Sequence, residues 1–130
     1  MNVTVDTSVL LAVCTNEPSK ARLIELTKDC HLIAPASVHW EVGNALSAML
    51  KRERITLEQA LTCIEYYQRI PIRLVEIELA SALNISNRFR MYAYDAYLLA
   101  CAIQYNTPII TLDGALRINA SQLGIKVLGE

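Results

Sequence analysis

The chain has 130 residues, of which 53% are hydrophobic and 19% are charged, and its formal net charge is −1. This length and composition predict one domain, spanning residues 1–130, with a large core, and they argue against intrinsic disorder. Because the net charge is close to zero, no global field attracts the chain to nucleic acids or membranes, so any nucleic-acid role would need a local basic patch.

The amino-terminal sequence and the cysteines indicate a reducing compartment. The first residues carry no basic segment, and the apolar run from Val9 to Val13 is too short for a signal peptide or a membrane span. The four cysteines are far apart and form no Cys-x-x-Cys pair, which is typical of free buried thiols. With only two histidines, the sequence argues against a zinc site. We therefore expect a cytoplasmic protein.

The first half of the chain predicts two strands and four helices. Strands are expected at 2–6 and 31–34, and helices at 9–14, 18–28, 35–51 and 57–68. Thr7 and Ser8 offer an N-cap for the first helix, whereas Pro35 suits the first turn of the long third helix. Thr56 and Gln59 form a capping box, so the third and fourth helices should make a hairpin.

The second half of the chain predicts three strands and three helices. Strands are expected at 70–75, 108–112 and 125–128, and helices at 76–86, 91–103 and 114–121. Strands that alternate with helices favour a parallel sheet with right-handed crossovers. We therefore predict an α/β fold, a three-layer α/β/α sandwich with a central parallel sheet of about five strands.

The helix predicted at 91–103 is apolar or aromatic at every position except Asp95. A helix without a polar face is expected to be buried, and Asp95 shares its face with Leu98, Leu99 and Ala102. A buried carboxylate needs a strong compensating partner. One interpretation is that Asp95 caps the helix N-terminus. The other is that it belongs to a site that compensates its charge.

Three further acids accompany Asp95. Asp6 and Asp113 each follow a predicted strand, and the carboxyl ends of parallel strands line the functional crevice of such sheets. Glu41 lies on the long helix beside its apolar stripe, with Asn44 on nearly the same side. Taken singly, Asp6 and Asp113 also fit turn chemistry, and Glu41 fits an acid that interacts with the helix dipole.

Clustered carboxylates cannot all stay ionised without a cation, and oxygen ligands without His or Cys favour Mg²⁺ or Mn²⁺. Such a cation polarises a phosphodiester and lowers the pKa of a bound water. Ser8 could hold a ligand water or a phosphate oxygen, or it could simply cap the first helix. Arg88, Arg90 and the basic corner 51–54 could contact the phosphates of a nucleic acid, or they could form an ordinary solvated surface.

Five segments also carry a family resemblance. In chain order they are Val5-Asp6-Thr7-Ser8-Val9-Leu10, Glu41-Val42-Gly43-Asn44-Ala45-Leu46, Tyr94-Asp95-Ala96-Tyr97-Leu98-Leu99-Ala100, Pro108-Ile109-Ile110-Thr111-Leu112-Asp113 and Leu123-Gly124-Ile125-Lys126-Val127. With these segments the chain resembles PIN-domain proteins, and specifically the VapC-type toxins of bacterial toxin–antitoxin pairs. The resemblance spans essentially the whole chain, and it rests on the order and spacing of the segments together.

The resemblance implies a Mg²⁺- or Mn²⁺-dependent ribonuclease that forms a homodimer and is held inactive by a VapB-type antitoxin. The acidic metal-binding and catalytic set would be Asp6, Glu41, Asp95 and Asp113. Ser8 would be the accessory hydroxyl near the metal, and Asn44 the polar neighbour of Glu41. Many relatives carry a further Asp or Asn near the last acid, whereas Gly114 and Ala115 follow Asp113 here. This departure implies a weakly held second metal, and therefore a one-metal site or a site of low activity.

Other classes of function compete with this one. A haloacid-dehalogenase phosphatase would need a second Asp at position 8, where Ser8 stands, and a signalling receiver would need an Asp after the third strand, where Val75-Glu76 stands. The main alternative is a PIN-like interaction module that binds a partner protein or RNA without cleaving it. Apolar residues on the predicted helical hairpin would then bind a second copy or an antitoxin helix, or they could simply be part of the intramolecular core. On the hairpin these residues are Met49, Leu50, Leu57, Leu61 and Ile64.

Overall fold

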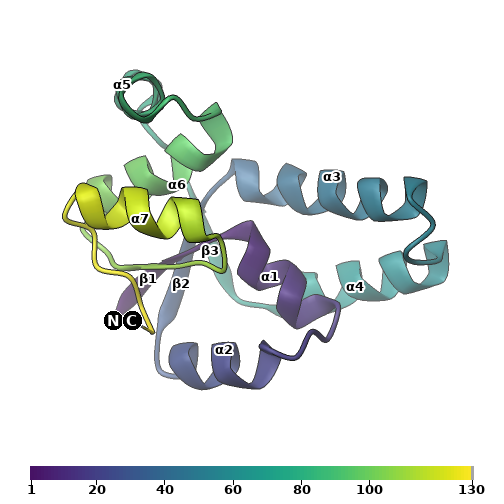
Figure 1. Cartoon of the computed structure of the whole chain (residues 1–130). Helices are drawn as coiled ribbons and strands as arrows, with labels where there is room; N and C mark the ends of the chain where they lie inside the picture. The colour runs from purple at the N-terminus through teal and green to yellow at the C-terminus, as the bar shows by residue number, and fades with distance from the viewer. Residues whose placement is uncertain (130) are drawn as a thin grey trace.

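A four-stranded parallel sheet lies at the centre of the computed structural model, which describes residues 1–129 (Figure 1). Its strands, in the spatial order β3-β2-β1-β4, are Ile72–Val75, His31–Pro35, Asn2–Val5 and Ile109–Ile110. The first strand of the chain therefore occupies an interior position, between β2 and β4. Because all pairs are parallel, the carboxyl ends of the strands lie along one edge of the sheet.

Seven helices are found in residues 1–129. They are α1 (Thr7–Cys14), α2 (Lys20–Thr27), α3 (Ser37–Lys51), α4 (Leu57–Arg69), α5 (Leu79–Phe89), α6 (Ala93–Gln104) and α7 (Gly114–Gln122). The predicted capping box is present at the start of α4, where Thr56 and Gln59 bond reciprocally. The α3–α4 hairpin projects beyond the sheet (Figure 1).

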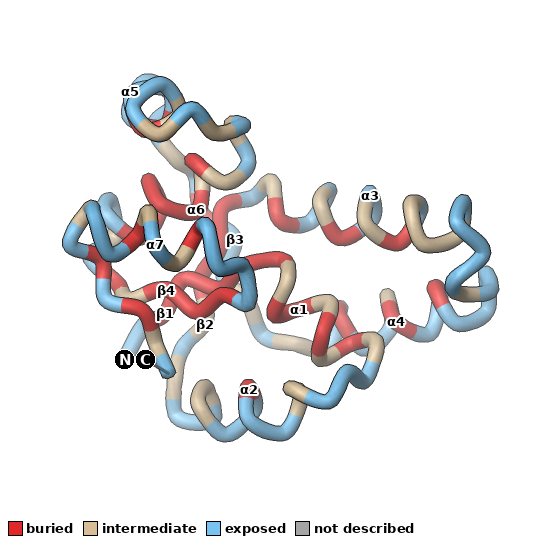
Figure 2. Tube along the Cα trace, in the orientation of Figure 1, coloured by how far each residue is buried: buried red, intermediate tan, exposed pale blue. Residues whose placement is uncertain are grey.

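Helices cover both faces of the sheet, as the alternation of side chains along β1 shows. Thr4 faces α6, where its hydroxyl lies 3.6 Å from the Cys101 sulfur. Val5 faces the opposite way, toward Val9 and Leu23 of α1 and α2. The strands are accordingly apolar on both faces, and Figure 2 shows the buried segments gathered in the strands and in the helix sides that face them. The predicted α/β fold with a central parallel sheet is confirmed.

Three predicted elements differ in detail. The predicted last strand is reduced to a single bridge between Val127 and Ile109, so the sheet has four strands and not about five. Pro35 does not begin the long helix but ends β2, because the ladder continues when the Ala36 N–H donates to the Val75 carbonyl at 3.1 Å. Helix α5 begins at Leu79 because Gln104 bonds the backbone of Glu76 and Glu78 and holds that segment extended.

The helix predicted to be buried all round is only partly buried. In α6 the Leu98 and Leu99 side chains are fully enclosed, but Tyr94 and Ile103 are exposed, as is Tyr92 just before the helix. This expectation was wrong because aromatic residues at the start of α6 extend over the surface instead of packing inward. No helix in residues 1–129 has the length and apolar character needed to cross a bilayer.

Candidate functional site

The four predicted acids all lie at the carboxyl-end edge of the sheet. Asp6 directly follows β1, and Asp113 lies just beyond β4, at the start of α7. Asp95 is in the first turn of α6, and Glu41 is in the second turn of α3. Asp95 feels the charges of Asp6 and Asp113, and Glu41 feels those of Asp6 and Asp95. We call these four residues the acid cluster.

Asp6 is the buried member of the acid cluster, with 7% of its surface exposed. Its Oδ2 accepts a hydrogen bond from the Ser8 hydroxyl at 2.7 Å and another from the Thr111 hydroxyl at 2.6 Å. The Ser8 oxygen in turn accepts the Leu112 N–H, and the Thr111 oxygen accepts the Asp113 N–H. Two hydroxyls therefore tie the end of β1 to the loop after β4.

Neither Ser8 nor Asp6 caps the start of α1 with its side chain. Ser8 is not an N-cap, because Asp6 occupies the N-cap position of α1 and Ser8 lies inside the helix. The Asp6 side chain makes no capping hydrogen bond either, since its Oδ2 is bonded to the two hydroxyls. The Ser8 hydroxyl thus orients Asp6, and its role beside a metal stays a prediction.

Glu41 carries the largest perturbation in the acid cluster. Burial raises the pKa of Glu41 to about 7; a hydrogen bond from Ser37 lowers it, the charges of Asp6 and Asp95 raise it, and the Thr7 hydroxyl lowers it. The Ser37 hydroxyl donates to Glu41 Oε2 at 3.2 Å. Because no acid lies in the first turn of α3, the interpretation of Glu41 as a first-turn dipole partner was wrong.

Asp95 is half-buried and is not an N-cap. The N-cap position of α6 belongs to Tyr92, so the capping interpretation of Asp95 was wrong. Burial raises the pKa of Asp95, and the charges of Asp6 and then Asp113 raise it further. The sequence raised the question of what compensates this carboxylate. Its acidic neighbours add to the repulsion instead of compensating the charge.

Asp113 fits the turn interpretation as well as the acid cluster. It is the N-cap of α7, and its Oδ1 accepts the Leu116 N–H at 3.0 Å. Capping uses one carboxylate oxygen and fixes the side chain, so it does not prevent the other oxygen from binding a ligand. A structural role and a role in the acid cluster are compatible here.

Sequence reasoning missed two hydroxyls at this site. Thr111 bonds both Asp6 and the backbone of Asp113, and it could have been found as the polar residue inside the otherwise apolar run 108–112. Thr7 is buried beside Glu41, and its hydroxyl has no hydrogen-bond partner within residues 1–129. The sequence carries no signal for the orientation of that hydroxyl.

A groove of about 310 Å³ lies next to the acid cluster, and we call it the strand-end groove. It is lined by Pro35, Ala36, Ser37, Val75, Glu76, Ile77, Leu79 and Tyr97. Ser37 joins the groove to Glu41 through its hydrogen bond, and Tyr97 follows Asp95 by two residues on α6. Tyr94 packs edge-on against Tyr97, with ring centroids 5.8 Å apart.

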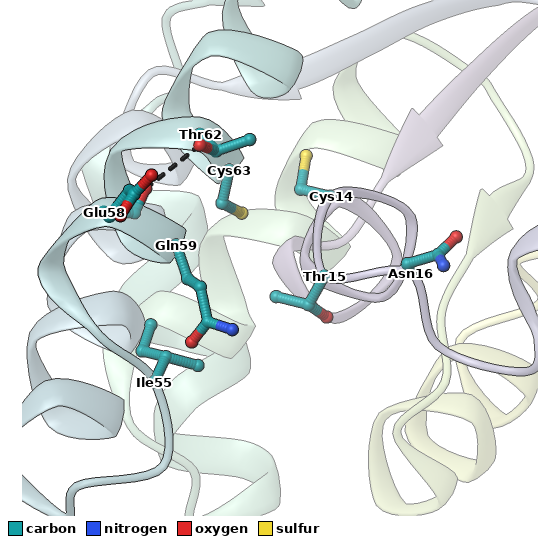
Figure 3. Close-up of a pocket in the computed structure, with 8 residues that line it drawn as sticks. All are labelled: Cys14, Thr15, Asn16, Ile55, Glu58, Gln59, Thr62 and Cys63. Carbon is teal, nitrogen blue, oxygen red and sulfur yellow. Dashed lines mark hydrogen bonds between the residues drawn. The ribbon is translucent and has the colours of Figure 1, made fainter.

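A second hollow, of about 330 Å³, lies between the end of α1 and α4 (Figure 3). Cys14 and Cys63 lie there on facing helices as free thiols. Burial raises the pKa of Cys14 to about 12, with further contributions from Cys63 that outweigh the opposing charge of Lys20. Since the thiolate is the reactive form, these are structural cysteines, and this hollow is separate from the acid cluster.

The donor set at the acid cluster suits a hard cation. Within residues 1–129 no three His, Cys, Asp or Glu side chains already stand together as a metal cage. However, the charges of Asp6 and Asp95 raise the pKa of Glu41, those of Asp6 and Asp113 raise the pKa of Asp95, and a cation among these groups would relieve that repulsion. The unpartnered Thr7 hydroxyl beside Glu41 is a second sign of an incomplete polar site. Oxygen ligands of this kind fit Mg²⁺ or Mn²⁺.

The family of the chain follows from comparison with known proteins. The PIN domain family model matches residues 3–120, which include the whole acid cluster. The chain belongs to the PIN domain family. No curated protein sequence matches it.

Solved structures share the fold of this PIN domain at low sequence identity. PAE2754 from Pyrobaculum aerophilum has a TM-score of 0.74 at 19% identity, covering 98% of this chain and 83% of that one. VapBC2 from Rickettsia felis, bound to a DNA fragment from its promoter, has a TM-score of 0.66 at 14% identity, covering 98% and 97%. VapC20 from Mycobacterium tuberculosis, a toxin that cleaves the sarcin–ricin loop, has a TM-score of 0.63 at 13% identity, covering 89% and 93%.

Proposed function

We propose that this PIN domain is a Mg²⁺- or Mn²⁺-dependent endoribonuclease and acts as the toxin of a VapBC-type toxin–antitoxin pair. The observation that carries the proposal is the acid cluster, in which Glu41 and Asp95 have raised pKa values beside two further carboxylates. Family membership and the fold shared with VapBC2 and the toxin VapC20 support it.

In this proposal Asp6, Glu41 and Asp95 hold the cation, and Asp113 orients it or the attacking water. A bound Mg²⁺ or Mn²⁺ supplies Lewis-acid polarisation of the phosphodiester and a lowered pKa for the attacking water. The protein's own part is positioning. Ser8 and Thr111 fix Asp6 Oδ2, Ser37 holds Glu41, and the cap on α7 fixes Asp113.

The exposed arginines before α6 are the best placed of the predicted RNA contacts. Arg88 and Arg90 are exposed and precede Asp95 by only a few residues. The basic corner at 51–54 lies at the far end of α3. A helix rises 1.5 Å per residue, so this corner is about 15 Å from Glu41 along the helix and less well placed. The nearby Tyr92 and Tyr94 expose 90% and 56% of their surface and offer ring faces on which unpaired bases can stack.

The α3–α4 hairpin supports the predicted antitoxin partner. Trp40, Leu57, Leu61 and Tyr66 are large apolar or aromatic side chains exposed on these helices. Such a surface suits an amphipathic helix of a partner protein.

Of the hairpin residues expected at this face, Met49 and Ile64 instead pack against the core. Partner binding without cleavage is the second candidate function, and a homodimer stays a prediction. Relief of toxicity by co-expression of a small neighbouring gene product would support the antitoxin.

The decisive test of the nuclease is Asp95→Asn, compared with Asp29→Asn. Asp29 is an exposed aspartate between α2 and β2, remote from the acid cluster in sequence, and serves as the matched control. We expect the metal-stripped wild type and Asp29→Asn to bind Mn²⁺ saturably in calorimetric titration and to cleave RNA. Asp95→Asn should lose both while keeping its circular dichroism spectrum. RNA cleavage by Asp95→Asn at the wild-type rate would refute the assignment.

A further inference from the structure

Thr7 is the one buried threonine in residues 1–129 whose hydroxyl has no hydrogen-bond partner. The other buried threonines are satisfied: Thr4 and Thr107 bond each other at 2.7 Å, and Thr111 bonds Asp6. An unmet buried hydroxyl is unfavourable, and native proteins rarely keep one without a reason. The position of Thr7 therefore calls for an explanation.

The position of Thr7 in its helix explains why its hydroxyl has no backbone carbonyl to which it can donate. Thr15, Thr27 and Thr62 each donate to the carbonyl four residues earlier, at distances of 2.6, 2.8 and 3.0 Å. Thr7 is the first residue of α1, and the residue four positions earlier, Val3, lies in β1. The usual helical acceptor is thus missing, and the hydroxyl must find a partner in another element.

Glu41 is the acceptor available to Thr7, because α1 packs against α3 and the Thr7 hydroxyl contributes to lowering the pKa of Glu41. No hydrogen bond of ordinary length and angle joins the two groups. Ser37 approaches the same carboxylate from within α3 and does make its bond, to Oε2. Glu41 is therefore flanked by one donor from its own helix and one from α1.

We propose that Thr7 is a positioning residue, whose hydroxyl completes a hydrogen bond to Glu41 when a divalent cation draws that carboxylate toward Asp6 and Asp95. The inference rests on the proposed metal-dependent function and goes beyond it. Thr7 adjoins Asp6 in sequence, so its bond couples Glu41 on α3 to the segment that carries Asp6. Partners that hold a metal ligand in this way typically contribute 10–100-fold to metal affinity.

The test compares Thr7→Val and Thr7→Ser with the wild type by calorimetric titration of metal-stripped protein with Mn²⁺. Valine keeps the shape of threonine but has no hydroxyl, and serine keeps the hydroxyl without the methyl group. We expect Thr7→Val to weaken Mn²⁺ binding about tenfold, the lower end of that range, and Thr7→Ser to restore most of it. Thr27→Val is the control, because the Thr27 hydroxyl serves only backbone carbonyls in α2.

Thermal melting without metal gives an independent readout. Because the Thr7 hydroxyl makes no hydrogen bond in the protein, Thr7→Val should melt at or above the wild-type temperature, whereas Thr27→Val should melt below it. If Thr7→Val does not fold, Thr7→Ala replaces it in both measurements.

Two results would overturn the inference while leaving the proposed function intact. They are wild-type Mn²⁺ affinity in Thr7→Val, and a loss in Thr7→Ser equal to that in Thr7→Val, which would assign the effect to the methyl group. Failure of the wild type itself to bind Mn²⁺ would overturn the metal site and the role of Thr7 together.

Discussion

At the scale of single residues, the protonation of Glu41 makes stability depend on pH, and it should do the same to the proposed metal binding. Its pKa is about 7 in the folded protein, against 4.5 for an ordinary glutamate. A carboxyl whose pKa is raised by folding adds stability below its unfolded pKa, and this contribution is lost as the pH rises through the folded value. Without metal, the folded state is therefore penalised by Glu41 as the pH rises from about 4.5 to about 7.

We expect metal-free wild type to lose stability relative to Glu41→Gln when the pH is raised from about 5 to about 8. Urea denaturation of both proteins at the two pH values measures the difference, and glutamine, which does not titrate, serves as the reference. Mn²⁺ affinity should change in the opposite sense and increase with pH, because the cation binds the ionised carboxylate. Parallel stability profiles for the two proteins would show that Glu41 does not titrate in this range.

Thr111 links two members of the acid cluster and should matter for both fold and site. Thr111→Val removes the hydroxyl that donates a hydrogen bond to the buried Asp6 carboxylate and accepts one from the Asp113 N–H. We expect a loss of about 1–3 kcal/mol in the free energy of unfolding, measured by urea denaturation. The control is Thr62→Val, whose exposed hydroxyl bonds only the Glu58 carbonyl and which should change stability by less than about 0.5 kcal/mol.

At the scale of elements, the acid cluster is built from helix beginnings. Asp6 and Asp113 occupy the N-cap positions of α1 and α7, Asp95 is in the first turn of α6, and Glu41 is one turn into α3. The positive ends of α1, α6 and α7 favour the carboxylates of Asp6, Asp95 and Asp113, each by about 0.3–1 kcal/mol, whereas Glu41 lies beyond the first turn of α3, where this effect has fallen off. The same arrangement favours an incoming phosphate. Parallel topology thus concentrates both the acids and the backbone N–H groups at one edge.

The connection between α5 and α6 allows a specific test of RNA binding. Arg90 adopts the left-handed conformation, with φ of 53°, at the end of α5, so Arg90→Asn removes its charge with a residue that tolerates this backbone. If Arg90 contacts phosphate, the slope of log affinity against log salt should decrease by about one. Fluorescence anisotropy with a short single-stranded RNA measures it. Arg54→Gln, in the distant basic corner, should leave the slope unchanged.

The helices and strands could be predicted from the sequence better than the contacts that their side chains make. Alternation of strands and helices was enough for the parallel sheet, because that pattern allows few topologies. It misplaced Pro35, since proline is also tolerated at a strand end, and it could not show that Asp95 lies past the helix cap. Thr7 and Thr111 were missed for a different reason. The orientation of a hydroxyl depends on tertiary contacts between segments about 100 residues apart, as between Asp6 and Thr111.

At the scale of the whole molecule, a bound cation should act as a cross-link between distant parts of the chain. The acid cluster takes its members from α3, α6 and the junctions after β1 and β4. At a free Mn²⁺ concentration about 100 times Kd, binding should stabilise the fold by about 2.7 kcal/mol and raise Tm by roughly 10 °C. Thermal melting with and without Mn²⁺ tests this. Asp29→Asn should show the same shift, and Asp95→Asn should show none.

The interior position of β1 has a consequence for the timing of protein synthesis. Thr4 and Val5 are made well before their partners on one side, Ile109 and Ile110, which follow about 100 residues later in the chain. The acid cluster is complete only after Asp113 has been made. The nascent chain therefore carries no assembled acid cluster while residues 7–112 are being added. At about 5–20 residues per second this takes at least several seconds, and in the proposed toxin a partner protein could bind the nascent chain during that interval.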